Sequence, residues 1–184
     1  MFSEFNDDQH RQQAEVVLLA LGRFTVQFER VCEAMRNAIM FALRSQGLKN
    51  QGMEQAIIGD TSSAELQVLL GALCNHLPNC DDEDRLVVKD LLKSIKEQTE
   101  QRNVVIHSAW RFGNTASELE LFAVAIRQRT KQNTGAVPEV HGVTAAYLDQ
   151  LINKMKGTQV LLQRLQTCLN QPQFKIATEL DKPL

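Results

Sequence analysis

The stretch DEDRLVVKDLLKSIKEQTEQRNVVIHSAWRFG, residues 82–113, carries the clearest helical pattern in the chain. Its apolar residues recur mainly at intervals of three and four, which keeps them on one face of a helix with 3.6 residues per turn. Acidic residues crowd the first turn, where the helix dipole favours them, and Asp81 or Asp82 can cap it. Gly113 is the expected end. The stretch predicts a long amphipathic helix that packs against other helices.

Arg102 lies on the apolar side of this expected helix. At about 100° per residue it falls roughly 20° from Ile95 in projection. Asn103 and His107 share a flank about 80° and 120° round from the centre of the apolar stripe, and the arginine is long enough to lean toward it. A guanidinium on a buried face needs a partner or a wet pocket. We therefore expect these three side chains to be exposed in a groove between two helices or between two subunits.

Each of these residues also has an ordinary structural interpretation. Glu29, near the apolar face of an expected helix over residues 10–46, could pair with Arg102 and neutralise it inside the fold. Glu29 could equally pair with a surface arginine at helical spacing. His107 could interact only with the dipole of the helix end. An open cleft that displays Arg102 and His107 would favour function, and a closed core would favour structure.

The pattern Arg102-Asn103-x-x-x-His107 resembles the R-x(4–6)-H motif of the HEPN superfamily, in which a polar residue commonly follows the arginine. The continuation from Ser108 to Trp110 is similar to that of many small bacterial members. The resemblance implies an all-helical bundle and, in many members, a metal-independent ribonuclease of toxin–antitoxin, antiphage or RNA-processing systems. It also implies a homodimer that acts on RNA without a cofactor, with an antitoxin or nucleotidyltransferase as a further partner.

The expected reaction is attack of a ribose 2′-hydroxyl on the adjacent phosphate. Histidine exchanges protons near neutral pH, so His107 is the candidate acid or base, and Arg102 offers a planar fork for the phosphorane charge. Asn103 could orient the substrate or the imidazole, Ser108 could donate to phosphate, and Trp110 would support the site. A symmetric dimer would supply one histidine as base and another as acid. The competing interpretation is a non-catalytic helical interaction or nucleotide-binding module.

The composition fits one soluble globular domain of 184 residues, with 43% hydrophobic and 23% charged residues. The net charge of −2 creates no global field for nucleic acid, so RNA binding would depend on a local patch. The four cysteines lack C-x-x-C spacing, which is typical of reduced thiols in a cytosolic protein and indicates no zinc site. With no signal peptide and no membrane-spanning apolar run, the expected location is cytoplasmic, with no membrane partner.

The remaining stretches complete the expected architecture. Helices are expected over residues 63–77 and 145–170, and residues 121–131 alternate as a strand does, with a possible return strand over 137–143. Arg127, Arg129 and Lys131 would share one strand face and, with Arg111, contact RNA; the alternative for the strand face is simple solvation.

The prediction is a single HEPN-like domain over 1–184. Its fold class is all-α, an antiparallel four-helix bundle with a small β-hairpin between the third and fourth long helices. Residues 1–9 and 171–184 are expected to be flexible.

Overall fold

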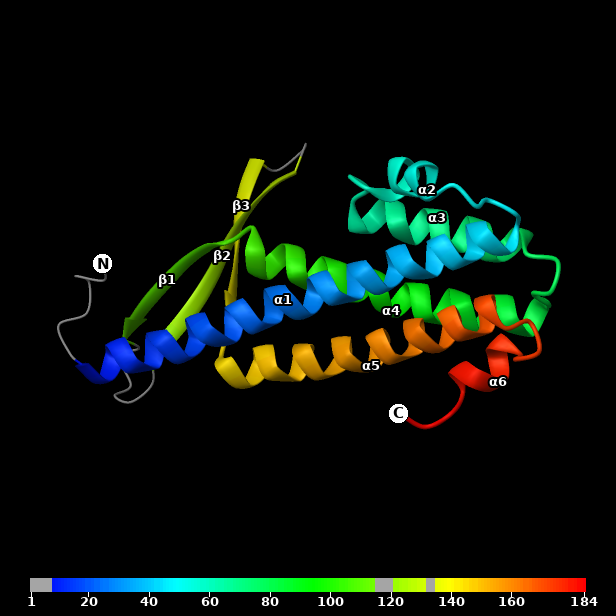
Figure 1. The fold of residues 1–184 in the computed structure, drawn as a ribbon. Coiled ribbons are helices and arrows are strands. Elements are labelled where there is room, and N and C mark those ends of the chain that lie inside the picture. The colour runs from blue at the N-terminus through cyan, green and yellow to red at the C-terminus, as the bar shows by residue number, and fades with distance from the viewer. Residues whose placement is uncertain (1–7, 115–120, 132–134) are drawn as a thin grey trace. The chain divides into compact units, whose positions relative to one another are not determined.

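The computed structural model describes residues 8–114, 121–131 and 135–184, and over these residues the chain is mostly helical, as predicted. Its elements in chain order, shown in Figure 1, are α1 (Asp8–Ser45), α2 (Gln51–Ile58), α3 (Ser63–His76), α4 (Asp82–Ile106), β1 (Ala109–Asn114), β2 (Leu121–Lys131), β3 (Gly135–Gly142), α5 (Ala145–Asn170) and α6 (Ile176–Leu180). In the described residues, no helix has both the length and the apolar character that a bilayer crossing requires.

The chain divides into two compact units. The first comprises residues 1–26 and 100–153, and the second comprises residues 27–99 and 154–184. The helices α1, α4 and α5 each contribute one segment to each unit. The three strands belong to the first unit, and α2, α3 and α6 belong to the second.

The second unit is a helical core with polar bridges between its helices. Amide side chains join α5 to its neighbours: Gln27 donates to Gln159 at 2.8 Å, and Gln98 donates to the Thr158 hydroxyl at 2.6 Å. Because Gln27, Gln98 and Thr158 are all buried, these bonds fix which helix faces meet. Around them the four longest helices bury apolar side chains, among them Phe28, Val31, Met35, Ile39, Leu66, Leu70, Leu91, Ile95, Met155, Leu162 and Leu165.

Side-chain caps mark the starts of α3, α4 and α5. Ser62 and Glu65 form a reciprocal capping box at the start of α3. At the start of α4 the Asp81 carboxylate accepts from the backbone N–H of Asp84 at 2.9 Å. Thr144 accepts from the backbone N–H three residues on, at 3.1 Å, and begins α5.

Residues 171–184, for which the sequence predicted flexibility, contain α6 and are contacted by side chains of other helices. The buried carboxylate of Asp84 accepts from the backbone N–H of Ala177 at 2.7 Å, which satisfies the start of the short helix. Arg164 of α5 donates to the backbone carbonyl of Lys182 at 2.6 Å. A five-residue helix with no side-chain cap of its own is therefore stabilised by tertiary contacts.

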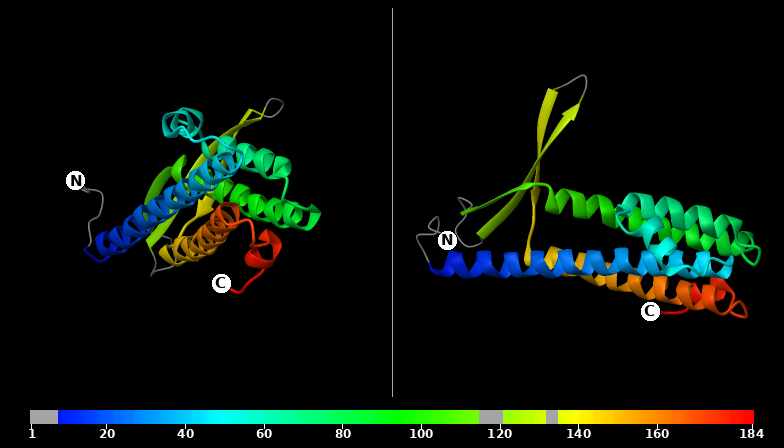
Figure 2. Two further views of the ribbon diagram at one scale, coloured as in Figure 1. Left: turned by 45° about the vertical axis from the view of Figure 1, so that its right-hand side comes forward. Right: turned by 45° about the horizontal axis from the view of Figure 1, so that its top comes forward.

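In the first unit the three strands form one antiparallel sheet in the order β1-β2-β3 (Figure 2). The predicted helix was expected to continue to Gly113, but α4 ends at Ile106 and β1 begins three residues later. Trp110 and Phe112 stack with ring centroids 6.2 Å apart. The fold class is thus helical with a three-stranded sheet, and β1 is a strand that the prediction did not contain.

The strands β2 and β3 pair in antiparallel register, with Arg127 opposite Glu139. The bounds of β2 are those expected for the first strand, whereas β3 begins at Gly135 and not at residue 137. Ala123 and Ala125 of β2 are both buried, so at this end of the strand the odd-numbered positions are covered. Of the turn predicted at Asn133-Thr134-Gly135, Gly135 is the first residue of β3, and residues 133 and 134 lie outside the described residues.

Candidate functional site

The chain turns sharply where α4 ends, and two side chains satisfy the last carbonyl groups of the helix. The Ser108 hydroxyl donates to the carbonyl of Val104, and the Trp110 indole N–H donates to the carbonyl of Val105 at 2.9 Å. Helix ends leave such carbonyls without intrahelical partners. Ser108 and Trp110 therefore finish the helix and direct the chain into β1, which gives both residues a structural role.

Arg102, Asn103 and His107 form one hydrogen-bonded group at this helix end. Nη1 of Arg102 lies 2.9 Å from Nε2 of His107 and 3.2 Å from Oδ1 of Asn103. Because a guanidinium can only donate, Nε2 is the acceptor and carries no proton in this arrangement. The backbone N–H of His107 also donates to the Asn103 carbonyl at 3.2 Å. The arginine thus leans toward the flank that holds the other two side chains, as the helical spacing predicts.

The group lies where a row of buried residues on α4 opens to solvent. Buried residues of α4 occur at positions 91, 95, 98 and 105. Arg102 lies four residues after position 98 and three before position 105, so it is on the same face of the helix. Arg102 and Asn103 are half-buried, and His107 is exposed. The imidazole is therefore reachable by a ligand, while the stem of the arginine is held against the protein.

This arrangement suits proton transfer beside a negatively charged group. The planar guanidinium of Arg102 can bind an anionic oxygen through two parallel N–H groups. An imidazole whose Nε2 accepts a hydrogen bond has a lone pair that can take a proton once the donor moves to another acceptor. The three side chains together offer a cation, a base and a neutral orienting group.

Glu29, the predicted partner of Arg102, is exposed. It belongs to the second unit, whereas Arg102 belongs to the first. The pairing of these two residues stays a prediction.

The predicted phosphate contacts are located only through their backbone. Arg111 lies in β1, and Arg127, Arg129 and Lys131 occupy alternate positions of β2. Their side chains lie outside the part of the chain that the structure describes. A role in RNA binding for these four residues stays a prediction.

Sequence reasoning missed a charged pair in the second unit. Arg44, near the end of α1, donates through Nε and Nη2 to the two carboxylate oxygens of Glu54 in α2, both at 2.7 Å. Glu54 has no exposed surface. The hydrogen bonds from Arg44 hold the pKa of the Glu54 carboxyl below its ordinary value, although burial acts the other way. The sequence offers no local signal for this pair, because Glu54 lies in a short helix among exposed residues.

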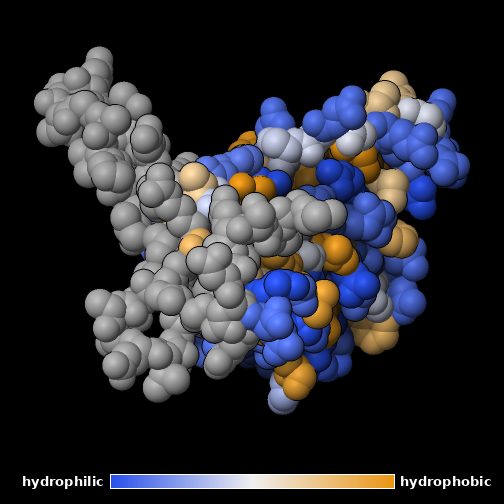
Figure 3. Space-filling view, turned by 90° about the vertical axis from the view of Figure 1, so that its left-hand side faces the viewer, coloured by the Kyte–Doolittle hydropathy of each residue, from blue (hydrophilic) through white to orange (hydrophobic). Residues whose placement is uncertain are grey.

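The other features of the described residues indicate no second candidate for a catalytic or metal site. No three His, Cys, Asp or Glu side chains among them come together as a metal site. On the described part of the face in Figure 3, hydrophobic residues are scattered between hydrophilic ones, as on an ordinary protein surface. No protein-family model, curated protein or solved structure compared with the chain matches it.

Proposed function

We propose that the chain is a metal-independent endoribonuclease of the HEPN type, with Arg102 and His107 at its active site. The observation that carries the proposal is the 2.9 Å separation between Arg102 Nη1 and His107 Nε2 at an exposed helix end. The two residues paired by the R-x(4–6)-H pattern are hydrogen-bonded to each other. An antiparallel bundle of four long helices with a β-hairpin insertion, assembled as a cytoplasmic homodimer, is part of the same proposal.

The chemical step begins when an RNA phosphate replaces His107 as the acceptor of the Arg102 guanidinium. The freed Nε2 takes the proton of the ribose 2′-hydroxyl, and the 2′ oxygen forms a bond to phosphorus. The bond from phosphorus to the 5′ oxygen breaks, and that oxygen takes a proton. The products are a 2′,3′-cyclic phosphate and a 5′-hydroxyl. Arg102 stabilises the negative charge that grows on the phosphorane oxygens.

A second copy of the chain supplies the proton for the leaving oxygen. In a two-fold dimer with the two motif segments facing one cleft, one His107 begins neutral as the base and the other begins protonated as the acid.

Asn103 acts as a positioning residue, because its side-chain oxygen accepts from the same guanidinium nitrogen as His107. Ser108 would have to give up its bond to Val104 before it could donate to phosphate. Arg111, Arg127, Arg129 and Lys131 are the proposed backbone contacts.

The direct test is incubation of the purified full chain with total RNA in EDTA, followed by analysis of the new termini. The proposal predicts 5′-hydroxyl and 2′,3′-cyclic phosphate ends, and light scattering on the same sample should give the mass of a dimer. Intact RNA would contradict it. Binding of RNA or nucleotides without cleavage would instead support the non-catalytic alternative. Growth inhibition on expression, relieved by an antitoxin or nucleotidyltransferase partner, would place the activity in a toxin or antiphage system.

A further inference from the structure

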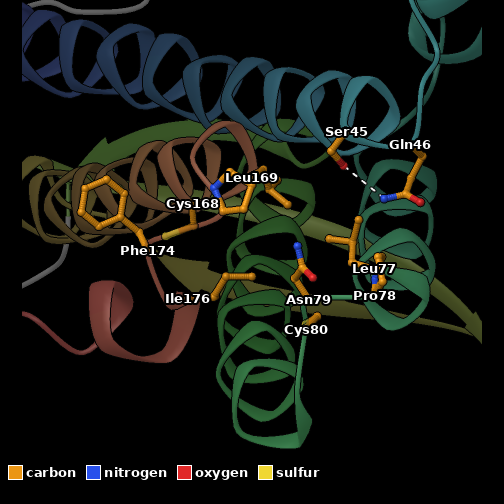
Figure 4. A pocket seen from close by; sticks show the side chains of 11 residues that line it. Ser45, Gln46, Leu77, Pro78, Asn79, Cys80, Cys168, Leu169, Phe174 and Ile176 are labelled. Atoms are coloured by element: carbon orange, nitrogen blue, oxygen red, sulfur yellow. Dashed lines mark hydrogen bonds between the residues drawn. The ribbon is translucent and has the colours of Figure 1, made fainter.

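A partly enclosed cavity of about 130 Å³ lies in the second unit, where three changes of chain direction meet (Figure 4). Its lining comes from the end of α1, the connection between α3 and α4, and the segment that joins α5 to α6. Every lining residue belongs to the second unit. The cavity is therefore a feature of one compact body.

The walls of this cavity are apolar and carry no charge. Leu77, Leu169 and Ile176 are buried lining residues, as are the thiols of Cys80 and Cys168. Burial raises the pKa of Cys168 to about 11 and also raises the pKa of Cys80, so both thiols are neutral at physiological pH. An ionic ligand would lose its hydration here without gaining a partner of opposite charge. The wall chemistry favours a neutral occupant.

The polar side chains of the lining come from the end of α1 and from the connection between α3 and α4. The Ser45 hydroxyl already donates to the Ala42 carbonyl at 2.7 Å, and the Gln46 amide donates to Ser45 at 3.3 Å. The amide of Asn79 makes no hydrogen bond within the described part of the chain, and Figure 4 shows it pointing toward the space that the lining side chains surround. The Asn79 amide can thus serve one polar group of an occupant.

The wall formed by the α5–α6 segment is held in place from outside the cavity. Lys175 contacts the carboxylates of Asp81, at 3.3 Å, and Glu83, and the Asp84 carboxylate accepts from the backbone N–H of Ala177 at 2.7 Å. None of these four side chains or the alanine lines the cavity. The segment that forms this wall is therefore anchored by contacts outside the cavity, whereas the empty cavity deprives its walls of dispersion contacts.

We propose that this cavity binds a neutral small molecule consisting of one ring with a single amide-like or hydroxyl substituent. The cavity volume of about 130 Å³ is close to the roughly 150 Å³ of an apolar cavity that accommodates benzene, and because the cavity is only partly enclosed, the substituent can extend beyond it. The ring lies against Leu77, Leu169 and Ile176, and the substituent hydrogen-bonds to Asn79. The site is separate from Arg102 and His107, so it does not depend on ribonuclease activity.

The test uses benzamide and benzoate, which share a ring and differ in charge. The full chain is titrated with each, and the methyl NMR signals of Leu77, Leu169 and Ile176 are followed, with Leu66 of the α3 core as a reference. Benzamide should give saturable shifts at the lining methyl groups, and benzoate should bind at least about tenfold more weakly. Equal binding of both, shifts centred on Leu66, or no saturable binding of benzamide would overturn the proposal.

Two substitutions of exposed asparagines sharpen the test without disturbing the core. Asn79→Ala should weaken benzamide binding by about tenfold, as expected for one lost hydrogen bond, and leave benzene binding unchanged. Asn75→Ala is the matched control, because Asn75 is exposed on α3 and does not line this cavity. Equal benzamide affinity in the Asn79→Ala and Asn75→Ala proteins would contradict the placement of the polar group.

Discussion

Two arginines near helix ends, Arg44 in the second unit and Arg102 in the first, differ in what their hydrogen bonds join. Arg44 binds both oxygens of a buried carboxylate and so connects α1 to α2. Arg102 binds Asn103 and His107, which lie one and five residues away at the end of the same helix. The first arrangement stabilises a tertiary contact. The second brings three side chains of one helix end into a single group, of which His107 is exposed.

This difference predicts that substitutions in the two regions have opposite consequences, and the largest effect is expected at His107. His107→Ala should lower RNA cleavage by about 10²–10⁴-fold, the usual contribution of a general acid or base. Because His107 is exposed, the free energy of unfolding should change by less than about 0.5 kcal/mol. Cleavage rate and urea unfolding measure the two quantities. His76→Ala, an exposed histidine at the end of α3, should change neither.

The interior of the second unit should respond to alkaline pH. Burial raises the pKa of Cys74 to about 12, whereas the same thiol in the unfolded chain ionises at its ordinary value. This difference in pKa contributes fully to the free energy of unfolding below the ordinary thiol pKa. The contribution is lost as the pH rises toward 12. Between pH 9 and pH 10 the free energy of unfolding should fall by about 1 kcal/mol on this account.

Urea unfolding at a series of pH values checks the alkaline prediction. Cys74→Ala should lower stability at neutral pH because it leaves a small cavity, and it should also reduce the slope above pH 9. An identical slope in the Cys74→Ala protein would show that this thiol does not ionise on unfolding in the expected way.

A smaller effect should separate the residues that finish α4 from those of the motif. Trp110→Phe keeps an aromatic ring to stack on Phe112 but removes the hydrogen bond to the Val105 carbonyl. Stability should fall by about 0.5–1.5 kcal/mol, and cleavage by no more than a few-fold. Urea unfolding and the RNA assay provide both numbers. A cleavage loss as large as that of His107→Ala would instead assign the indole to the chemistry.

The smallest expected effect is confined to acid pH and concerns the Arg44–Glu54 pair. The pKa of Glu54 is lowered by its hydrogen bonds to Arg44, so the pair contributes stability above the ordinary carboxyl pKa and loses it as the pH falls through the folded value. The effect is limited because the Arg44 side chain is 45% exposed to solvent. Thermal unfolding of Glu54→Gln should vary less with pH below about 4.5 than that of the wild type. Parallel profiles would contradict this assignment.

The parts of the fold that the sequence predicts are those determined by local spacing. The bounds of α1, α3 and α5 follow from apolar periodicity and from caps such as Ser62 and Thr144. The strand β1 was missed because Ala109–Asn114 continues the helical spacing of α4 for one turn. The alternation of Trp110 and Phe112 before a glycine was the available signal.

The features that could not be predicted depend on partners distant in sequence. The helix α6 is held by Asp84, 93 residues from the Ala177 backbone N–H that it binds. At the candidate site, spacing alone was enough to place Arg102 beside Asn103 and His107, because all three lie within six residues. Spacing could not show that Ser108 and Trp110 would be used to finish the helix.

The most direct test is a side-by-side measurement of Arg102→Ala and Arg44→Ala, recording both the RNA cleavage rate in EDTA and the thermal midpoint of unfolding. Arg102→Ala should lose about 10²–10³-fold in cleavage and keep the wild-type midpoint. Arg44→Ala should keep cleavage at temperatures where it is folded and have a lower midpoint, because Glu54 is left buried without its cation. Wild-type cleavage by the Arg102→Ala protein, or a midpoint lowered more by that change than by Arg44→Ala, would contradict the assignment of the two arginines.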